Sequence, residues 1–95
     1  MAAYLIAFAK AKSANRIPEY SSAAGPTLGA SGGSVVTRGK VRSLVGGFSA
    51  DSCLIVKFKD AAAIEAWHSS PRYQALIPLR DEVMDSNFLV LEQPT

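Results

Sequence analysis

Two segments of this 95-residue chain carry apolar side chains on both faces of a predicted strand, and this feature constrains the fold more than any other. Side chains of a strand alternate between the two faces of a sheet, so that residues 4, 6 and 8 share one face and residues 5, 7 and 9 share the other. All six are apolar, and residues 53–58 show the same two-sided pattern. A sheet that contains these strands must therefore be covered on both sides.

The first helix is predicted from apolar residues at three- and four-residue steps between Ile17 and Leu28. Ser13 and Asn15 are both candidates for its N-cap, and Pro18 favours Asn15 because proline is tolerated only near the start of a helix. The glycines of residues 29–33 are expected to end the helix, since glycine accepts positive φ.

Residues 34–48 again show a strand pattern, which glycines interrupt. One long strand, bent or bulged at Gly39, fits best, although two strands joined by a turn at residues 38–40 would give the same pattern. The next strand, residues 53–58, follows a turn.

A second helical region starts after Asp60, which is expected to cap it, and restarts at Ser70-Pro71, with serine as cap and proline at the first helical position. Pro78 is expected to shorten this second piece. Residues 81–86 are then predicted to form a polar connection, and residues 88–91 the last strand.

The order strand, helix, strand, strand, helix, strand predicts a single α+β domain over residues 1–95, a ferredoxin-like βαββαβ plait. Right-handed crossovers place both helices on one face of its antiparallel sheet. No element remains to cover the other apolar face, which predicts a homodimer with two sheets packed face to face about a twofold axis.

Charge and cysteine content exclude several classes of protein. The ten Lys and Arg residues are spread along a chain of formal net charge +2, so no dense basic stripe is available for nucleic acid. Cys53 is the single cysteine, and no His, Asp or Glu pair has metal-ligand spacing, so we expect no metal and no cofactor. The absence of a signal, a membrane-spanning run or a lipidation motif predicts a cytoplasmic protein without membrane contact.

The segment 66–76, AWHSSPRYQAL, followed by Leu79-Arg80, resembles the bacterial domain-of-unknown-function family 1330. Shorter matches in the same order are residues 4–7, 18–20, 32–33, 38–39 and 54–58. The resemblance implies a dimeric α/β barrel with a pocket in each subunit between helices and sheet, and for most members no established reaction.

The chain departs from this family's pattern at two places. The family usually has an acidic residue and a proline around the phenylalanine at 58, where this chain has Lys57 and Lys59, and it usually has tyrosine where this chain has His68. No role that depends on that carboxylate or phenol is carried over.

Three charged side chains are the candidates for chemistry. His68 has an ordinary pKa of about 6.5 and is the candidate acid or base, although a partly exposed histidine at a helix end is the plainer interpretation. Arg38 lies in a strand beside Gly39, where its guanidinium could hold a carboxylate or enolate inside the pocket, or could point outward as an edge charge. Arg80 is either a second anion clamp or the basic end of a helix.

Aromatic residues and serines complete the predicted site. Trp67, Tyr73 and Tyr20 are expected mainly in the core, with the pocket wall as the alternative. Ser70 is a candidate ligand contact that could equally be a helix cap. Cys53 is interpreted as inert packing, because no histidine is near it in the sequence.

These residues support two hypotheses about function. The first is a cofactor-independent enzyme acting on a small anionic metabolite, with His68 as acid or base and Arg38 and Arg80 as electrostatic clamps. The second is a non-catalytic dimeric module that binds a small ligand in the same pocket.

Overall fold

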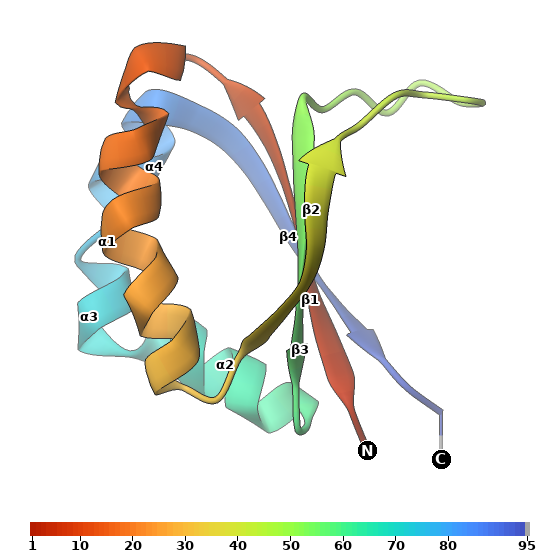
Figure 1. The fold of residues 1–95 in the computed structure, drawn as a ribbon, viewed down its shortest axis with the longest axis vertical. Coiled ribbons are helices and arrows are strands. Elements are labelled where there is room, and N and C mark those ends of the chain that lie inside the picture. Colours follow the sequence, from red (N-terminus) through yellow and green to blue (C-terminus); the bar gives the residue numbers. More distant parts are fainter. Residues whose placement is uncertain (95) are drawn as a thin grey trace.

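Four antiparallel strands form one sheet in the spatial order β2-β3-β1-β4 in the computed structural model, which describes residues 1–94. The strands are β1 (Ala3–Ala11), β2 (Ser34–Lys40), β3 (Ser52–Phe58) and β4 (Met84–Glu92). The helices are the short 3-10 helix η1 (Ala14–Arg16), α1 (Ile17–Ala30), α2 (Ala61–Ser69), α3 (Pro71–Gln74) and α4 (Ile77–Val83). All helices lie on one side of the sheet (Figure 1), which confirms the predicted ferredoxin-like α+β fold.

The core lies between the helices and the helix-facing side of the sheet. Leu5 of β1 pairs with Val56 of β3, so both side chains point toward the helices. Ile64 and Trp67 of α2 pack against this layer, and each of these four residues is no more than 3% exposed. Burial of a side chain of this size contributes about 1.5–3 kcal/mol to folding.

Two of the predicted helix starts are confirmed by their hydrogen bonds. Asp60 Oδ1 accepts the backbone N–H of Ala63 at 2.8 Å at the start of α2. Ser70 Oγ accepts the N–H of Tyr73 at 3.3 Å, and Pro71 is the first residue of α3. These short side chains satisfy backbone donors that the first helical turn leaves free.

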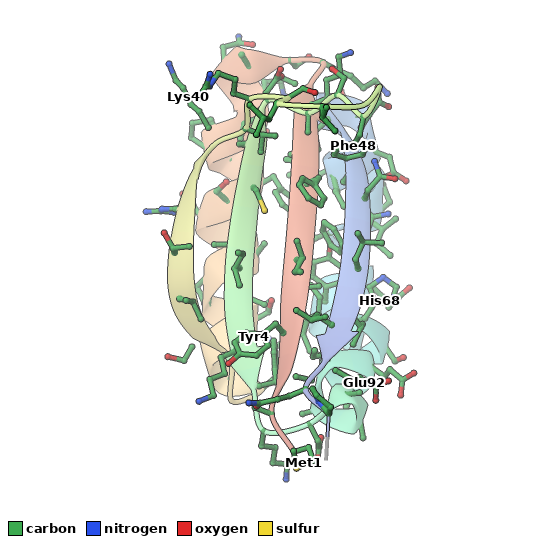
Figure 2. All side chains as sticks on the ribbon, turned by 90° about the vertical axis from the view of Figure 1, so that its right-hand side faces the viewer. Met1, Tyr4, Lys40, Phe48, His68 and Glu92 are labelled. Carbon is green, nitrogen blue, oxygen red and sulfur yellow. The ribbon has the colours of Figure 1, made fainter. Side chains whose placement is uncertain are left out.

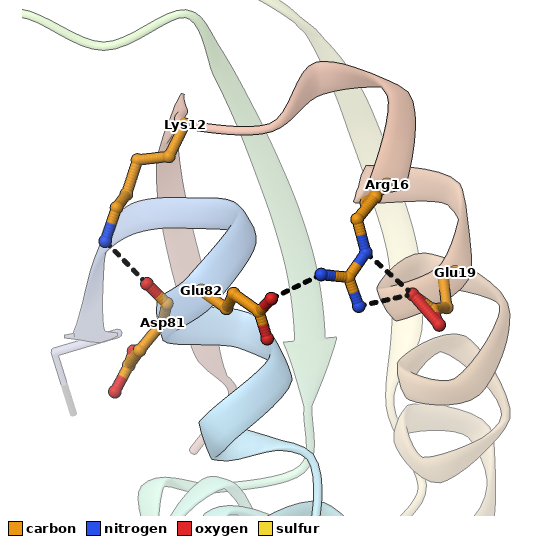
Figure 3. Close-up of polar contacts among 5 residues, drawn as sticks. All are labelled: Lys12, Arg16, Glu19, Asp81 and Glu82. Atoms are coloured by element: carbon orange, nitrogen blue, oxygen red, sulfur yellow. Dashed lines mark hydrogen bonds and ion pairs between the residues drawn. The ribbon is translucent and has the colours of Figure 1, made fainter.

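The cap predicted for α1 is wrong. Neither Ser13 nor Asn15 caps this helix with its side chain; Arg16 directly precedes α1. The Arg16 guanidinium forms ion pairs with Glu19, at 3.1 Å, and with Glu82 of α4 (Figure 3). These exposed pairs place α4 beside α1 but contribute little free energy, because solvent screens them.

The segment after α1 also differs from the prediction. The bulge in β2 lies at Val36, not at Gly39, because Val35 pairs with Val56 while Thr37 already pairs with Ile55. The strand then ends at Lys40, and residues 41–50 leave the sheet as a long excursion (Figure 1).

The chain after Pro78 is more regular than predicted. Pro78 does not end a helix: it lies in the first turn of α4, where proline is well tolerated. Residues 81–83 are helical, and β4 begins at Met84. Val83 is fully buried and Met84 is 6% exposed, so these two residues belong to the core, while Asp81, Glu82 and Asp85 are exposed.

The sheet face opposite the helices is open in the single chain, as Figure 2 shows. Tyr4, Ile6 and Phe8 of β1 are half-buried on this face. Leu89 and Leu91 of β4, which lie beside Ile6 and Tyr4, are 53% and 54% exposed. No helix or strand within residues 1–94 covers these side chains, as the two-sided strand pattern predicts. In the same residues, no helix is long and apolar enough to cross a membrane.

Candidate ligand-binding site

A cavity of about 450 Å³ lies between α1 and the sheet. Its walls are mainly apolar, and the residues that form them include Leu5, Ala7, Ile17, Tyr20, Ala24, Leu28, Leu54, Trp67, Met84 and Phe88. Small-molecule sites in proteins have volumes of roughly 300–1,000 Å³ and similarly apolar walls with few polar groups. The cavity therefore has the size and lining of a site for a small organic molecule.

The polar groups of this cavity come mainly from β2 and β3. Arg38 and Lys40 contribute positive charge, and Ser52 and Cys53 line the same end. Burial raises the pKa of the Cys53 thiol, which agrees with its interpretation as inert packing. No Asp or Glu among residues 1–94 lines the cavity, so its charged end is wholly cationic.

The bulge at Val36 decides the side of the sheet on which Arg38 lies. Strict alternation from Val35, which faces the helices with Val56, would send residue 38 to the open face. The extra residue shifts the register so that Arg38 pairs with Leu54, on the helix-facing side. Arg38 thus lines the cavity, but its side chain is exposed, so the expectation that it lies inside is corrected to a position at the rim.

His68 lines a second hollow of about 490 Å³, together with Glu65, Ser69 and Val90. Its side chain is exposed, as the plainer interpretation of a helix-end histidine expects. Figure 2 shows His68 beyond the β4 edge of the sheet. Leu5, Trp67 and Phe88 border both hollows and form a wall between them. The structure therefore does not bring His68 and Arg38 together in one pocket.

Trp67 is both core residue and cavity wall. It is 2% exposed, and its ring lies 4.3 Å from that of Tyr73, measured between centroids. Its indole N–H donates to Thr27 Oγ1 at 2.9 Å, and the Thr27 hydroxyl donates to the Ala24 carbonyl at 2.6 Å. Thr27 is not among the residues predicted from the sequence; its position seven residues after Tyr20, on the same face of the helix, is the signal that identifies it.

A buried line of hydrogen bonds runs beside the Trp67 wall. Arg80 Nη1 donates to Tyr73 Oη at 3.2 Å, and Tyr73 Oη lies 2.7 Å from Tyr20 Oη. The guanidinium can only donate, so the Tyr73 oxygen accepts from Arg80, while either hydroxyl can be the donor in the bond between the two tyrosines. Burial, followed by this hydrogen bond, raises the pKa of Tyr20 above its usual range, so the phenol stays protonated.

The remaining predicted residues support the site without lining either hollow. Tyr73 is fully buried, and Arg80 lies over the Phe88 ring at 5.3 Å while its Nε donates to Asp81 at 3.0 Å. Ser70 caps α3 and also donates to the Trp67 carbonyl at 2.7 Å. Of the predicted ligand contacts, only Arg38, Tyr20 and Trp67 line the main cavity.

Metal-binding groups do not gather anywhere in residues 1–94: no three His, Cys, Asp or Glu side chains come close enough to hold an ion.

Residues 2–94 match the sequence model of the family described as Domain of unknown function (DUF1330). The chain belongs to the DUF1330 family. No curated protein matches this DUF1330 chain.

Solved structures share the fold of this DUF1330 protein. A protein of unknown function from Rhodopseudomonas palustris is 19% identical, with a TM-score of 0.81 over 99% of this chain and 83% of its own. SnoaB, a cofactor-independent oxygenase from Streptomyces nogalater, is 9% identical, with a TM-score of 0.70 over 99% and 94% of the two chains. A dimeric ferredoxin-like protein of unknown function from Thermobifida fusca is 13% identical, with a TM-score of 0.69 over 98% and 92%. At these identities the likeness concerns the fold.

Proposed function

We propose that this DUF1330 protein binds a small organic anion with an apolar body in the cavity between α1 and the sheet. The observation that carries this proposal is the bulge at Val36, which brings Arg38 to the rim of an apolar cavity. The apolar walls favour a hydrophobic ligand body, and a guanidinium at the rim favours a carboxylate or enolate group.

The electrostatics of the cavity support an anion over a neutral ligand. Arg38 and Lys40 line the same rim, and no carboxylate among residues 1–94 lines the cavity to offset them. Two neighbouring positive charges with no negative charge beside them attract an anion more strongly than the net charge of +2 spread over the whole chain would suggest.

We infer further that the protein acts as a homodimer that pairs through the open sheet face. The apolar side chains of β1 and β4 on this face support the inference, because a second sheet would remove them from water. The ferredoxin-like neighbours from Thermobifida fusca and Bacteroides fragilis are described as dimeric.

Calorimetry with two ligands tests the proposed site. The ligands are 1-naphthoate, a carboxylate with an apolar body, and 1-naphthamide, its neutral analogue. Arg38→Met keeps the apolar stem and removes the charge, so we expect naphthoate affinity to fall roughly 5- to 30-fold and naphthamide affinity to stay unchanged. Arg42→Met is the matched control, because Arg42 is also exposed but does not line the cavity.

A cavity-filling variant tests the location independently. Gly25 lines the cavity, and a Cβ added there would meet no atom within 4 Å. Gly25→Leu should therefore fold, and its affinity for both 1-naphthoate and 1-naphthamide should be lower than that of the wild type. Equal binding by wild type, Arg38→Met and Gly25→Leu would contradict the proposed site.

A cofactor-independent enzyme remains the second candidate. The second hollow supports it, because His68 and Glu65 line this hollow beside the Trp67 wall. The fold neighbour SnoaB is a cofactor-independent oxygenase. If His68 is an acid or base, His68→Gln should abolish turnover of a substrate found by metabolite profiling while leaving naphthoate binding unchanged, since His68 lies outside the main cavity.

A further inference from the structure

The segment 41–50, called the arm here, leaves the sheet between β2 and β3. Figure 1 shows that it projects from the side of the sheet opposite the helices, and Figure 2 shows that it crosses one end of the open face. The arm and the uncovered apolar side chains of β1 and β4 therefore lie on the same side of the molecule.

The base of the arm is anchored to β1, directly and through Asp51, the residue that precedes β3. The Val41 N–H donates to the Asp51 carbonyl at 3.1 Å, and the Asp51 N–H donates to the Ala9 carbonyl at 2.8 Å. The ring of Phe48 packs edge-on against that of Phe8 at 4.8 Å, on the open face. These contacts hold the direction in which the arm leaves the sheet.

The tip of the arm is a defined turn that presents two apolar side chains. Ser43 Oγ donates to the Gly46 carbonyl at 3.1 Å, and Gly46 has a φ of +96°, which glycine adopts without steric cost. Between them, Leu44 and Val45 are 90% and 92% exposed, the highest values among the large apolar side chains of residues 1–94. Within residues 1–94, the Leu44 and Val45 side chains pack on nothing, so this hydrogen-bonded turn presents them to a surface outside the single chain.

The arm is long enough to reach a second copy packed on the open face. Each limb has about five residues and can span up to roughly 16 Å. Stacked sheets lie about 10 Å apart, so an arm of this length can reach the level of the second sheet.

The area of the sheet face favours this use of the arm. Four strands of seven to nine residues present a face of roughly 450 Å². A specific interface buries about 800 Å² of accessible surface on each partner, so apolar area on the arm would add to that of the sheet face. Two arms, one from each subunit, would enlarge the interface with the apolar side chains Leu44 and Val45.

We propose that the arm is a dimer clasp, in which Leu44 and Val45 of each subunit pack against a second copy of this chain. The inference rests on the proposed homodimer and adds to it that the arm forms part of the dimer interface. The partner is thus another DUF1330 chain with an identical open face and arm.

Sedimentation equilibrium from 0.1 to 100 µM tests the clasp with variants that separate arm from face. Burial of one leucine or valine changes an equilibrium constant by a factor of about ten or more. Leu44→Glu with Val45→Glu should therefore raise the dimer dissociation constant at least 100-fold. Ala23→Glu with Ala62→Glu, at exposed helix positions, adds the same charge and should leave the dimer unchanged.

The remaining measurements distinguish failure of the clasp from failure of the dimer. Ile6→Asp in the middle of the open face should give a monomer, with far-UV circular dichroism to confirm the fold. A wild type that is monomeric at 100 µM overturns both proposals. A wild-type dimer that the arm variant leaves intact overturns the clasp alone.

Hydrogen exchange locates the contact directly. The amides of residues 43–46 should be protected in the wild type above the dissociation constant and not below it. Exchange that does not depend on concentration contradicts the clasp. Arm-dependent binding to anionic lipid vesicles together with an unchanged dimer would assign the tip to a membrane surface and overturn the proposal.

Discussion

The hydroxyl oxygens of Tyr20 and Tyr73 lie 2.7 Å apart in a buried hydrogen bond that joins α1 to α3 across 53 residues of sequence. Arg80 of α4 donates to the same Tyr73 oxygen, so three helices meet at one phenol. The two hydroxyls depend on each other for hydrogen bonding, because Tyr20 is 8% exposed and Tyr73 is fully buried. The arrangement of the helices over the cavity therefore depends on this contact.

Tyr73→Phe should lower the free energy of unfolding by about 1–3 kcal/mol, because it leaves the Arg80 guanidinium and the Tyr20 hydroxyl without their buried partner. Urea unfolding followed by circular dichroism measures this change. Ser22→Ala is the control: Ser22 is exposed on α1, away from this contact, and removal of its hydroxyl should not lower the free energy of unfolding. Equal effects of the two substitutions would contradict the role of Tyr73.

The stability of the protein should fall as the pH rises above about 10, the ordinary pKa of tyrosine. Burial raises the pKa of Tyr20 in the folded state, so above this pH the unfolded chain loses the phenol proton while the folded chain keeps it. The stabilisation is thus complete below pH 10 and is lost progressively at higher pH. Unfolding curves between pH 8 and 11 measure the effect, and in Tyr20→Phe the decline should be shallower.

Thr27→Val should destabilise the protein by about 1–3 kcal/mol, because the buried Trp67 indole N–H then lacks an acceptor. Trp67→Phe removes the donor, so in the double variant the loss from Thr27→Val should become smaller. This double-mutant cycle isolates the hydrogen bond from changes in packing. Additive effects of the two substitutions would show that the bond contributes nothing.

Trp67→Ala should lower the free energy of unfolding by roughly 3–5 kcal/mol, since it opens a void in the wall between the two hollows. Thermal or urea unfolding gives the magnitude. A loss below about 1 kcal/mol combined with lost naphthoate binding would instead identify Trp67 as a ligand contact with little structural role.

Gly33→Ala should destabilise by about 1–3 kcal/mol, because the added Cβ would lie 2.8 Å from Phe58 Cζ and 3.0 Å from the Leu28 carbonyl oxygen. Gly39→Ala is the matched control, since a Cβ there meets nothing within 4 Å. The control should be neutral or slightly stabilising. A similar unfolding midpoint for both variants would contradict the close approach at Gly33.

The sequence predicted the α+β fold and several local features because their causes lie within a few residues. The two-sided pattern of residues 4–9 and 53–58 indicates central strands regardless of what packs on them. Asp60 and Ser70 cap helices through bonds to residues three positions ahead, which spacing alone suggests. The predictions of an open apolar face and of a dimer rest on the same local alternation of side chains.

The site was less predictable, because its geometry depends on pairings between distant segments. Alternation within β2 could not locate the bulge at Val36, since the register is set by the residues of β3 that each position meets. That bulge decides that Arg38 reaches the cavity rim.

Local sequence thus determined which residues form strands and helices, since backbone dihedral preferences and side-chain periodicity act over one or two turns. Only the tertiary structure decided which side chains meet. The contact of Tyr20 with Tyr73 and the separation of His68 from Arg38 follow from how α1, α2 and α3 pack on the sheet. Packing of side chains from distant segments fixes these relations, and no short stretch of the chain contains that information.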